Sequence, residues 1–413
     1  MLVIGGGPVG VCCAYFLARA GAEVALIERA EAVCPRTGAA YGNCGLITPS
    51  AAVPLAAPGV LARGLRMMLD SSSPFRVTPR LSSTLARWLW LFRASCDAVG
   101  CRSRMPVLRG LHVASAALHE DLGRKHGASW GYQRNGLFEV CETTSGLEAA
   151  AADVREARRV GVDVQELSPA AVRERLPGLR CDTAGGFLFP EDAHVDPMLF
   201  TRAMAELAAE AGAEIITGVE ALALDSSRAS SVRLVTTRGD RVAGQVVLAA
   251  GSWTPALSRS LGLRLPVEPA KGYSIDVASS DDSVEAPVLL AEESTVLTPF
   301  AETLRIGSTL ELAGWDMTVH PRRVARLQHV AARAAGSCAA GPVRSVWRGL
   351  RPLSPDGLPF VGRCPGSENV MVATGHGMLG LTLGPISGRL VAELAGGVQP
   401  ALDLAPLSPG RFG

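Results

Sequence analysis

Three glycines near the N-terminus have the spacing of a phosphate-binding turn. They form a GxGxxG pattern that follows a short apolar strand pattern and opens a helical pattern over residues 8–20. In such a turn the first glycine permits a tight bend, the second lets backbone N–H groups approach a pyrophosphate, and the third lets the helix pack on the strand. The helix N-terminus then faces the phosphates. We expect these contacts from Gly5, Gly7, Pro8, Val9 and Gly10.

An acidic residue follows the next predicted strand, residues 23–27. The carboxylate of Glu28 can accept hydrogen bonds from the hydroxyls of an adenosine ribose, and Arg29 stands beside it. Strand, glycines, helix and acid in this order favour a dinucleotide site over an ordinary glycine turn.

Two distant glycine-rich segments indicate that the bound cofactor is long. Residues 242–251 form an apolar strand pattern that ends in Ala250 and Gly251 and is followed by Trp253. Residues 373–383 are rich in glycine and precede a final helical pattern. Because both segments bring a strand end back to the sheet of the GxGxxG turn, the sequence predicts an extended cofactor.

Four later residues have side chains suited to a substrate or a cofactor ring. Arginine binds a carboxylate through two parallel hydrogen bonds, so Arg351 is a candidate carboxylate receptor, unless it forms an ion pair with Asp356. His376, between two glycines, is either a polar group near cofactor and substrate or a histidine satisfied by backbone. Lys271 could bond a ring acceptor and Tyr273 could reach the substrate; the alternative is a surface lysine and a core tyrosine.

Residues 37–49 form a loop of small residues with almost no charge. Such a loop can lie against a flat ring, whereas a plain surface loop of this length carries more charge. Cys44 is either a reactive thiol or a small apolar filler. A separate cluster of Asp192, His194 and Asp196, which precedes a helical pattern, fits helix-capping and turn chemistry, since no fourth ligand is in sight, and we expect no metal site.

These segments together resemble the D-amino-acid oxidase superfamily of FAD-dependent amine oxidoreductases, most closely the bacterial D-amino acid dehydrogenases. The resemblance covers nearly the whole chain. It is carried by residues 5–10 with 28–29, 42–47, 270–274, 347–352 with 354–357, and 374–377.

The resemblance implies a fold, a cofactor and a site. The expected fold is α/β, with a Rossmann-like FAD-binding domain interleaved with an α+β substrate domain, as in D-amino-acid oxidase and glutathione reductase. The resemblance also implies that FAD binds without a covalent link, that Arg351 holds the substrate carboxylate, and that Val219 contacts the adenine side. The remaining residues expected to line the flavin are Gly42, Asn43, Cys44, Gly45, Leu46, Ile47, Gly375, His376, Gly377, Met378, Leu379, Gly380, Leu381 and Thr382.

The interleaving predicts discontinuous domains. The FAD-binding domain would use residues 1–50, 185–265 and 345–413, and the substrate domain residues 51–184 and 266–344. The 413 residues are enough for two such units with large cores.

The composition excludes other classes of protein. A net charge of +1 gives no field that would draw the chain to nucleic acid. Ten scattered cysteines without a CxxC pair, together with no visible signal peptide, predict a reduced, cytoplasmic protein. The 40 basic residues include only two lysines, Lys125 and Lys271, so Lys271 is one of two ammonium groups that arginine has not replaced.

A basic, aromatic stretch over residues 85–93 allows two interpretations. Trp88, Trp90 and Phe92 could insert at a membrane surface, which would place the protein on the inner face of the cytoplasmic membrane. Alternatively they pack in the core of the second domain.

We therefore expect an FAD-dependent amino acid dehydrogenase or oxidase. It would oxidise a D-amino acid or a cyclic imino acid such as a proline derivative by hydride transfer to flavin, and pass electrons to a quinone or another carrier. Three alternatives remain at this stage: an oxygen-using oxidase of the glycine or sarcosine type, a non-catalytic FAD-bearing partner protein, and a polyol-phosphate dehydrogenase. The last would need a basic cluster for phosphate, which the substrate domain lacks in the sequence.

Overall fold

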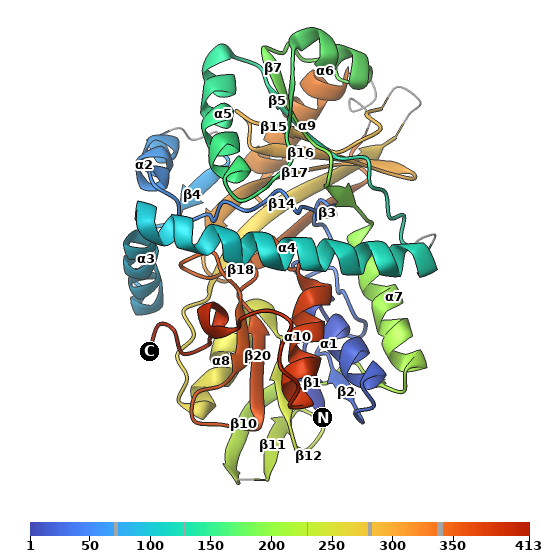
Figure 1. Ribbon diagram of the computed structural model, residues 1–413, viewed down its shortest axis with the longest axis vertical. Coiled ribbons are helices and arrows are strands. Elements are labelled where there is room, and N and C mark those ends of the chain that lie inside the picture. The colour runs from blue at the N-terminus through green and yellow to red at the C-terminus, as the bar shows by residue number, and fades with distance from the viewer. Residues whose placement is uncertain (70–72, 127–128, 229, 280–282, 337–341) are drawn as a thin grey trace.

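The computed structural model describes residues 1–69, 73–126, 129–228, 230–279, 283–336 and 342–413. Two sheet-centred units are stacked, with the long helix α4 (Ala98–His126) running across the boundary between them (Figure 1). The N-terminal strand and the C-terminal helix α10 (Gly384–Ala395) both lie in the lower unit.

The lower unit is built on a mostly parallel sheet with strand order β19-β20-β13-β1-β2-β9. Strands β1, β2, β9, β13 and β20 run parallel, and β19 is antiparallel to β20. The strands are β1 (Leu2–Ile4), β2 (Ala25–Ile27), β9 (Glu214–Ile216), β13 (Val246–Leu248), β19 (Phe360–Arg363) and β20 (Val370–Thr374).

Alternate side chains of this sheet enter two different cores. Val3 and Val247 pack against helices α1 (Pro8–Arg19), α7 (Pro197–Glu210) and α10. Leu2 and Leu248 face the opposite side. That side is covered by the small sheet β10 (Ala221–Arg228), β11 (Ser231–Thr236) and β12 (Arg241–Ala243), and by the short helices η2 (Gly251–Trp253), α8 (Thr254–Ser258) and η3 (Arg259–Leu261).

The upper unit is built on a larger mixed sheet with strand order β18-β14-β17-β16-β15-β5-β7-β6, with β4 paired to β17. Its strands are β4 (Phe75–Val77), β5 (Leu137–Cys141), β6 (Gln165–Leu167), β7 (Gly185–Phe189), β14 (Glu268–Ala278), β15 (Val288–Leu290), β16 (Thr295–Phe300), β17 (Thr303–Leu312) and β18 (Ser345–Leu353). Its helices are α2 (Val60–Leu69), α3 (Ser83–Ser95), α5 (Thr144–Arg158), α6 (Pro169–Arg175) and α9 (Pro321–Ala335). Three further elements are the strands β3 (Leu46–Ile47) and β8 (Ala193–His194), which pair with each other, and the C-terminal η5 (Ala405–Leu407).

The strand pairing in the larger sheet differs from two of the expected domain boundaries. Residues 185–189 and 345–353 were expected in the FAD-binding domain, but β7 and β18 are strands of the larger sheet. Each strand is followed directly by a segment that leads back to the lower unit. In both places the chain therefore passes from the upper unit to the lower unit after the strand ends, not before the strand begins.

Candidate cofactor and substrate site

The glycine turn lies between β1 and α1, as the GxGxxG pattern predicts. Gly5 has a φ of +115°, and a Cβ at Gly10 would fall 1.8 Å from the carbonyl oxygen of Gly5, so neither position accepts a side chain. A Cβ at Gly7 would meet no atom within 4 Å, because this glycine faces open space. Gly7 is also the N-cap of α1, and neither a side-chain cap nor an acid in the first turn neutralises that helix end. The turn can therefore bind a phosphate group through backbone N–H groups and the helix dipole.

Glu28 lies at the end of β2 in the position predicted for the ribose ligand. It is buried, and its carboxylate accepts hydrogen bonds from the backbone N–H groups of Gly6 (2.7 Å) and Ala30 (2.9 Å). The guanidinium carbon of Arg29 lies 3.9 Å from the ring centroid of Trp253, across the end of β13. Segments from three parts of the chain thus meet at this end of the site.

An elongated cavity of about 330 Å³ runs along these elements. It extends from Val219 and Leu222, past the glycine turn, to Arg351 and Met378. The predicted residues in its wall are Gly5, Gly7, Pro8, Val9, Glu28, Arg29, Asn43, Val219, Ala250, Gly251, Trp253, Arg351, His376, Gly377, Met378, Gly380 and Leu381. The wall brings the glycine turn, Glu28 and residues from distant parts of the chain together, an arrangement that suits an extended dinucleotide such as FAD.

Other wall residues were not singled out from the sequence. They include Cys34, Pro35, Gly38, Ala39, Ala40, Glu220, Leu222, Ala256, Leu257, Pro352 and Thr374. Most are small or apolar, and such residues have no pattern that separates a cavity wall from a core. Only the low charge of residues 37–40 gave a signal, and we had expected contacts from a later part of that loop.

Arg351 stands in the cavity wall on β18, without a carboxylate partner among the described residues. It donates a hydrogen bond to the carbonyl oxygen of Thr309, and burial lowers its pKa. Asp356, the alternative partner suggested by the sequence, is instead paired with Arg411 at 2.8 Å. A guanidinium with unused donors beside a cavity can bind a carboxylate.

The carbonyl that Arg351 contacts belongs to a strained residue. Thr309 has a φ of +78°, which a β-branched residue rarely adopts. It lies where the β14–β17 pairing changes register between Lys271 and Tyr273. The irregularity turns the carbonyl of Thr309 toward Arg351.

Lys271 and Tyr273 lie on the opposite face of the larger sheet, contrary to our expectation that they stand near the flavin. Arg351 pairs with Ala270, whereas Lys271 pairs with Leu350 and Tyr273 with Arg348. Side chains alternate along a strand, so Lys271 and Tyr273 face away from the cavity. The alternative interpretation is wrong for Lys271 as well, because the lysine is completely buried rather than at the surface.

His376 lies in the cavity wall as an uncharged ring. Burial lowers its pKa from 6.5 to about 3, so it is neutral at physiological pH. Its Nε2 lies 2.8 Å from the hydroxyl of Ser387 on α10, so a side chain rather than backbone satisfies this atom. Its Nδ1 has no hydrogen-bond partner among the described residues and is available to a ligand.

Much of the loop expected to line the flavin packs behind the cavity wall. Asn43 lines the cavity, and its side-chain oxygen accepts a hydrogen bond from Gly45 at 2.8 Å. A Cβ at Gly42 would clash with the ring of Trp347, and the thiol of Cys44 fills the space over Gly307. Burial raises the pKa of this thiol, which agrees with a filler rather than a reactive group. The expected contacts outside the wall are Gly10, Gly42, Cys44, Gly45, Leu46, Ile47, Gly375, Leu379 and Thr382.

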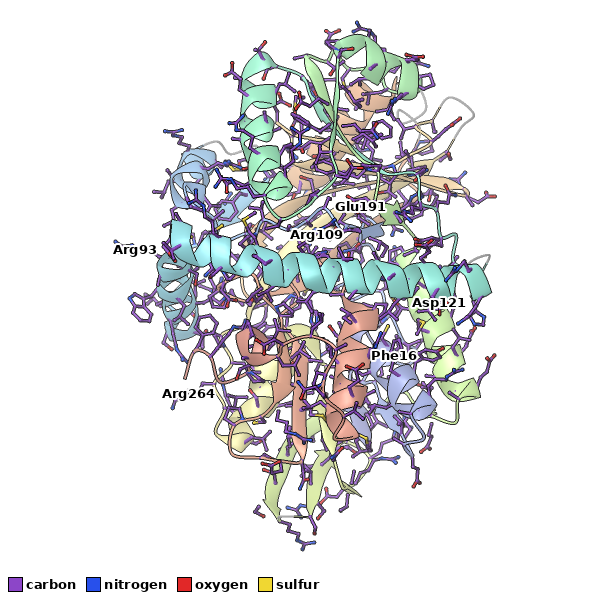
Figure 2. The ribbon with its side chains drawn as sticks, in the orientation of Figure 1. Phe16, Arg93, Arg109, Asp121, Glu191 and Arg264 are labelled. Carbon is purple, nitrogen blue, oxygen red and sulfur yellow. The ribbon has the colours of Figure 1, made fainter. Side chains whose placement is uncertain are left out.

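Helix α4 and the segment after β7 hold this loop in place. Arg109 on α4 donates to the carbonyl of Pro49 at 2.9 Å and forms a 2.7 Å ion pair with Glu191, and both side chains are labelled in Figure 2. The carboxylate of Asp192 accepts hydrogen bonds from the backbone N–H (3.0 Å) and hydroxyl (2.6 Å) of Ser50. Asp196 caps α7, as predicted. In the part of the chain that the structure describes, no group of three or more His, Cys, Asp or Glu side chains could hold a metal ion.

Comparison with known proteins agrees with this geometry. The sequence profile of the FAD-dependent oxidoreductase family that includes D-amino-acid oxidase matches residues 1–394. The chain belongs to this family. The site is therefore that of an FAD-dependent oxidoreductase.

Individual members of the family are similar over their full length. The chain is 35% identical to a D-amino acid dehydrogenase of Cereibacter sphaeroides, covering 100% of this chain and 95% of that protein. It is 33% identical to a D-amino acid dehydrogenase of Rhizorhabdus wittichii, covering 100% of both. Glycine oxidase from Geobacillus kaustophilus has a similar structure, with a TM-score of 0.78, 27% identity, and coverage of 100% and 98%.

Proposed function

We propose that the chain catalyses the oxidative deamination of a D-amino acid, with FAD as the hydride acceptor. The relatives named D-amino acid dehydrogenase support this substrate class, since they match the chain from end to end at 30–35% identity. Glycine, small D-amino acids and cyclic imino acids share the group that the site would recognise, a carboxylate next to an amine-bearing carbon.

The observation that carries the proposal is the guanidinium of Arg351. It stands in the cavity wall and has no carboxylate partner among the described residues. A substrate carboxylate would supply the missing charge through two parallel hydrogen bonds. This contact would fix the amino acid in one orientation, with its α-carbon directed along the cavity toward the cofactor.

The bound FAD supplies the chemistry by accepting a hydride from the α-carbon of the substrate. Arg351 would bind and orient the carboxylate. His376 remains neutral near pH 7, so its free Nδ1 can donate or accept a hydrogen bond but adds no charge. The backbone N–H groups that precede α10 lie beside the wall formed by Gly377 and Gly380, where they can stabilise negative charge. A hydride transfer from the neutral amine needs no strong base, and positioning would account for the catalysis.

We also propose that FAD is held without a covalent bond. The wall residues that could attach a flavin are His376, which is engaged with Ser387, and Cys34, which lies near the glycine turn and is itself buried. Acid precipitation of the purified protein should therefore release all of the yellow cofactor into the supernatant.

A further proposal is that electrons pass to a quinone or another carrier at a membrane surface. No helix of the described residues is long and apolar enough to span a membrane. Helices α2 and α3 lie together on one flank, and residues of both enter one core cluster (Figure 1). The outer face of α2 exposes Leu61, Leu65 and Met68 at helical spacing.

Helix α3 continues this surface, and its aromatic residues divide between the two interpretations of residues 85–93. Trp88 is buried and donates a hydrogen bond from its indole N–H to the carbonyl of Leu353, and Phe92 is also buried. Trp90 remains 67% exposed. Arg93 of α3 and Arg264 reach outward on the same flank in Figure 2. An exposed apolar face rimmed by arginines suits an anionic lipid surface.

Anaerobic mixing with D- and L-amino acids tests the main proposal. Loss of flavin absorbance with D-amino acids, but not with their L-enantiomers, is the expected result. An oxidase of the glycine type is the second candidate, because the glycine oxidase structure matches the whole chain. Stoichiometric hydrogen peroxide in air would favour the oxidase, and no bleaching by any amino acid would overturn the proposal.

A further inference from the structure

Lys271 and Tyr273 are the motif residues that the cofactor cavity leaves without a role. Both are completely buried on the far face of β14, where they hold the segment between β17 and α9. The ammonium of Lys271 donates to the carboxylate of Asp316 at 2.7 Å and to the carbonyl of Thr318 at 3.2 Å. The hydroxyl of Tyr273 donates to the same carbonyl at 3.1 Å.

The ammonium of Lys271 is charged although the side chain is buried. Burial alone would lower the pKa of Lys271, but its hydrogen bonds with Asp316 and Tyr273 raise that pKa. The same contact holds the pKa of Asp316 well below its usual range, and Glu311 lies 3.5 Å from the ammonium. An ammonium carries its three donors on one compact atom at the end of a flexible stem, whereas a guanidinium is a larger, planar group. The site therefore gives a physical reason for a lysine in this arginine-rich chain.

Arg348, on the same face of the larger sheet, holds Met317, the residue between Asp316 and Thr318. Arg348 on β18 donates from Nε to the carbonyl of Met317 at 3.0 Å. Within the segment, the backbone N–H of Thr318 donates to Asp316 at 2.9 Å. Three consecutive residues, 316–318, are thus fixed to the larger sheet.

The residue immediately before this anchored stretch reaches the lower unit. The indole of Trp315 packs on that of Trp253, with ring centroids 5.3 Å apart and an angle of 45° between the rings. Trp253 lies in the wall of the FAD cavity and carries the guanidinium of Arg29 against its ring. Trp315 itself is 54% exposed and does not line that cavity. Arg29, Trp253 and Trp315 therefore form a continuous set of contacts from the ribose-binding strand to the upper unit.

We infer that Lys271 is a positioning residue for the cofactor site. By fixing residues 316–318 it holds Trp315 against Trp253, and this contact keeps Trp253 in the wall beside Glu28 and Arg29. Trp253 sits on the three-residue helix η2 and is only partly buried, so it depends on its neighbours for a fixed position. The affinity for FAD is thereby set in part by two residues of the upper unit that do not touch the cavity. The inference rests on the non-covalent binding proposed above.

Titration of the apoprotein with FAD, followed by flavin fluorescence, tests the tryptophan contact. Trp315→Ala should raise the Kd for FAD about threefold to tenfold, the factor that an aromatic pair contributes. Trp315→Phe should restore most of the affinity, and Trp90→Ala, which removes another exposed indole, should change nothing. The double variant Trp253→Ala with Trp315→Ala should bind FAD no more weakly than Trp253→Ala alone. An unchanged Kd for Trp315→Ala, or fully additive effects, would overturn the inference.

The lysine is tested against the only other lysine in the chain. Lys271→Met should raise the Kd for FAD as much as Trp315→Ala does, with no further increase in the double variant, whereas Lys125→Met should match the native protein. If Lys271→Met does not fold, Asp316→Asn removes the charge on the exposed side of the pair and should raise the Kd in the same direction.

Two outcomes separate this inference from the proposed function. Flavin that stays with the acid-precipitated native protein would overturn non-covalent binding and this inference together. Native affinity for FAD in Lys271→Met and Asp316→Asn, with normal bleaching by D-amino acids, would overturn the inference alone.

Discussion

The guanidinium of Arg351 lies directly over the α-carbon of Gly272 on the neighbouring strand. A Cβ at position 272 would fall 2.2 Å from the guanidinium carbon. The two strands are paired so that Gly272 stands opposite Gly349 and Ala270 opposite Arg351, on the face that meets the cavity. The position of the proposed carboxylate receptor therefore depends on the absence of a side chain from the adjacent strand.

Gly272→Ala should displace Arg351 while leaving the FAD-binding turn intact. We expect the apparent substrate constant to rise about tenfold or more, because misplacing one end of a paired hydrogen bond removes most of its free energy. Steady-state kinetics and the flavin spectrum of the purified variant measure both effects. The control is Gly244→Ala, since a Cβ at that position meets no atom within 4 Å. Native kinetics in Gly272→Ala would show that the position of Arg351 is not critical.

Gly7→Val should give folded protein that does not retain FAD. The new Cβ would meet no protein atom within 4 Å, so the valine side chain would extend into the volume where the pyrophosphate is expected. Absorbance at the flavin band and far-UV circular dichroism separate loss of cofactor from loss of fold. Gly244→Val, which also enters open space but lies away from the cavity, should stay yellow. A fully yellow Gly7→Val would mean that this turn does not bind the cofactor.

Stability should fall as the pH rises toward 7, because of Asp192. Burial raises the pKa of this carboxyl from 3.8 to about 7, although the hydrogen bonds from Ser50 act to lower that pKa. Between these two values the native state holds a proton that the unfolded state has lost, so stability decreases as pH rises through that window. The difference corresponds to a free energy of unfolding on the order of 4 kcal/mol.

Thermal unfolding of native protein and Asp192→Asn from pH 5 to pH 8 measures this effect. The variant should lose part of the decrease in Tm with pH, while Asp163→Asn, at an exposed position, should retain it. Glu139, whose pKa burial also raises to about 7, contributes a separate decrease that the variant keeps. An identical pH profile for Asp192→Asn and the native protein would contradict the prediction.

The apolar outer faces of α2 and α3 should bind anionic vesicles. Leu65 and Trp90 are each 67% exposed, so replacing both with serine removes apolar area without disturbing the core. Sedimentation with vesicles that contain anionic phospholipid should recover the native protein but about tenfold less of Leu65→Ser with Trp90→Ser. Val242→Ser, an exposed apolar residue of the lower unit, is the matched control. Equal sedimentation of all three would exclude this surface as the membrane contact.

Much of the fold could be predicted from the sequence because its helices and turns are locally encoded. The glycine turn, α1, the N-cap of α7 and the final helix follow from spacing and capping residues alone. The domain boundaries were less accurate, since strand patterns do not show which of two sheets a strand joins. β7 is an apolar strand that would fit either sheet, and β18 combines apolar residues with two arginines, which does not assign it to one sheet.

The incorrect placement of Lys271 and Tyr273 has one physical cause. Nearly every residue of β14 is buried, so its sequence lacks the alternation that would reveal which side chains share a face. Arg351 was predicted as the carboxylate receptor because its residue type suits a carboxylate and the resemblance to the family favours this role over an ion pair. Lys271 and Tyr273 were misplaced because only the register with β18 shows that they point the other way. Trp315 has no motif, and its role depends on a contact between two units.

The central claim is that Arg351 binds the substrate carboxylate, and Arg351→Leu tests it most directly. The measurement is the rate of anaerobic flavin reduction as a function of D-amino acid concentration, in native protein, in Arg351→Leu and in Arg344→Leu, an exposed arginine at the start of the same strand. We predict an apparent dissociation constant about 100-fold or more higher for Arg351→Leu, an unchanged flavin spectrum, and native behaviour for Arg344→Leu. A near-native constant for Arg351→Leu would contradict the account.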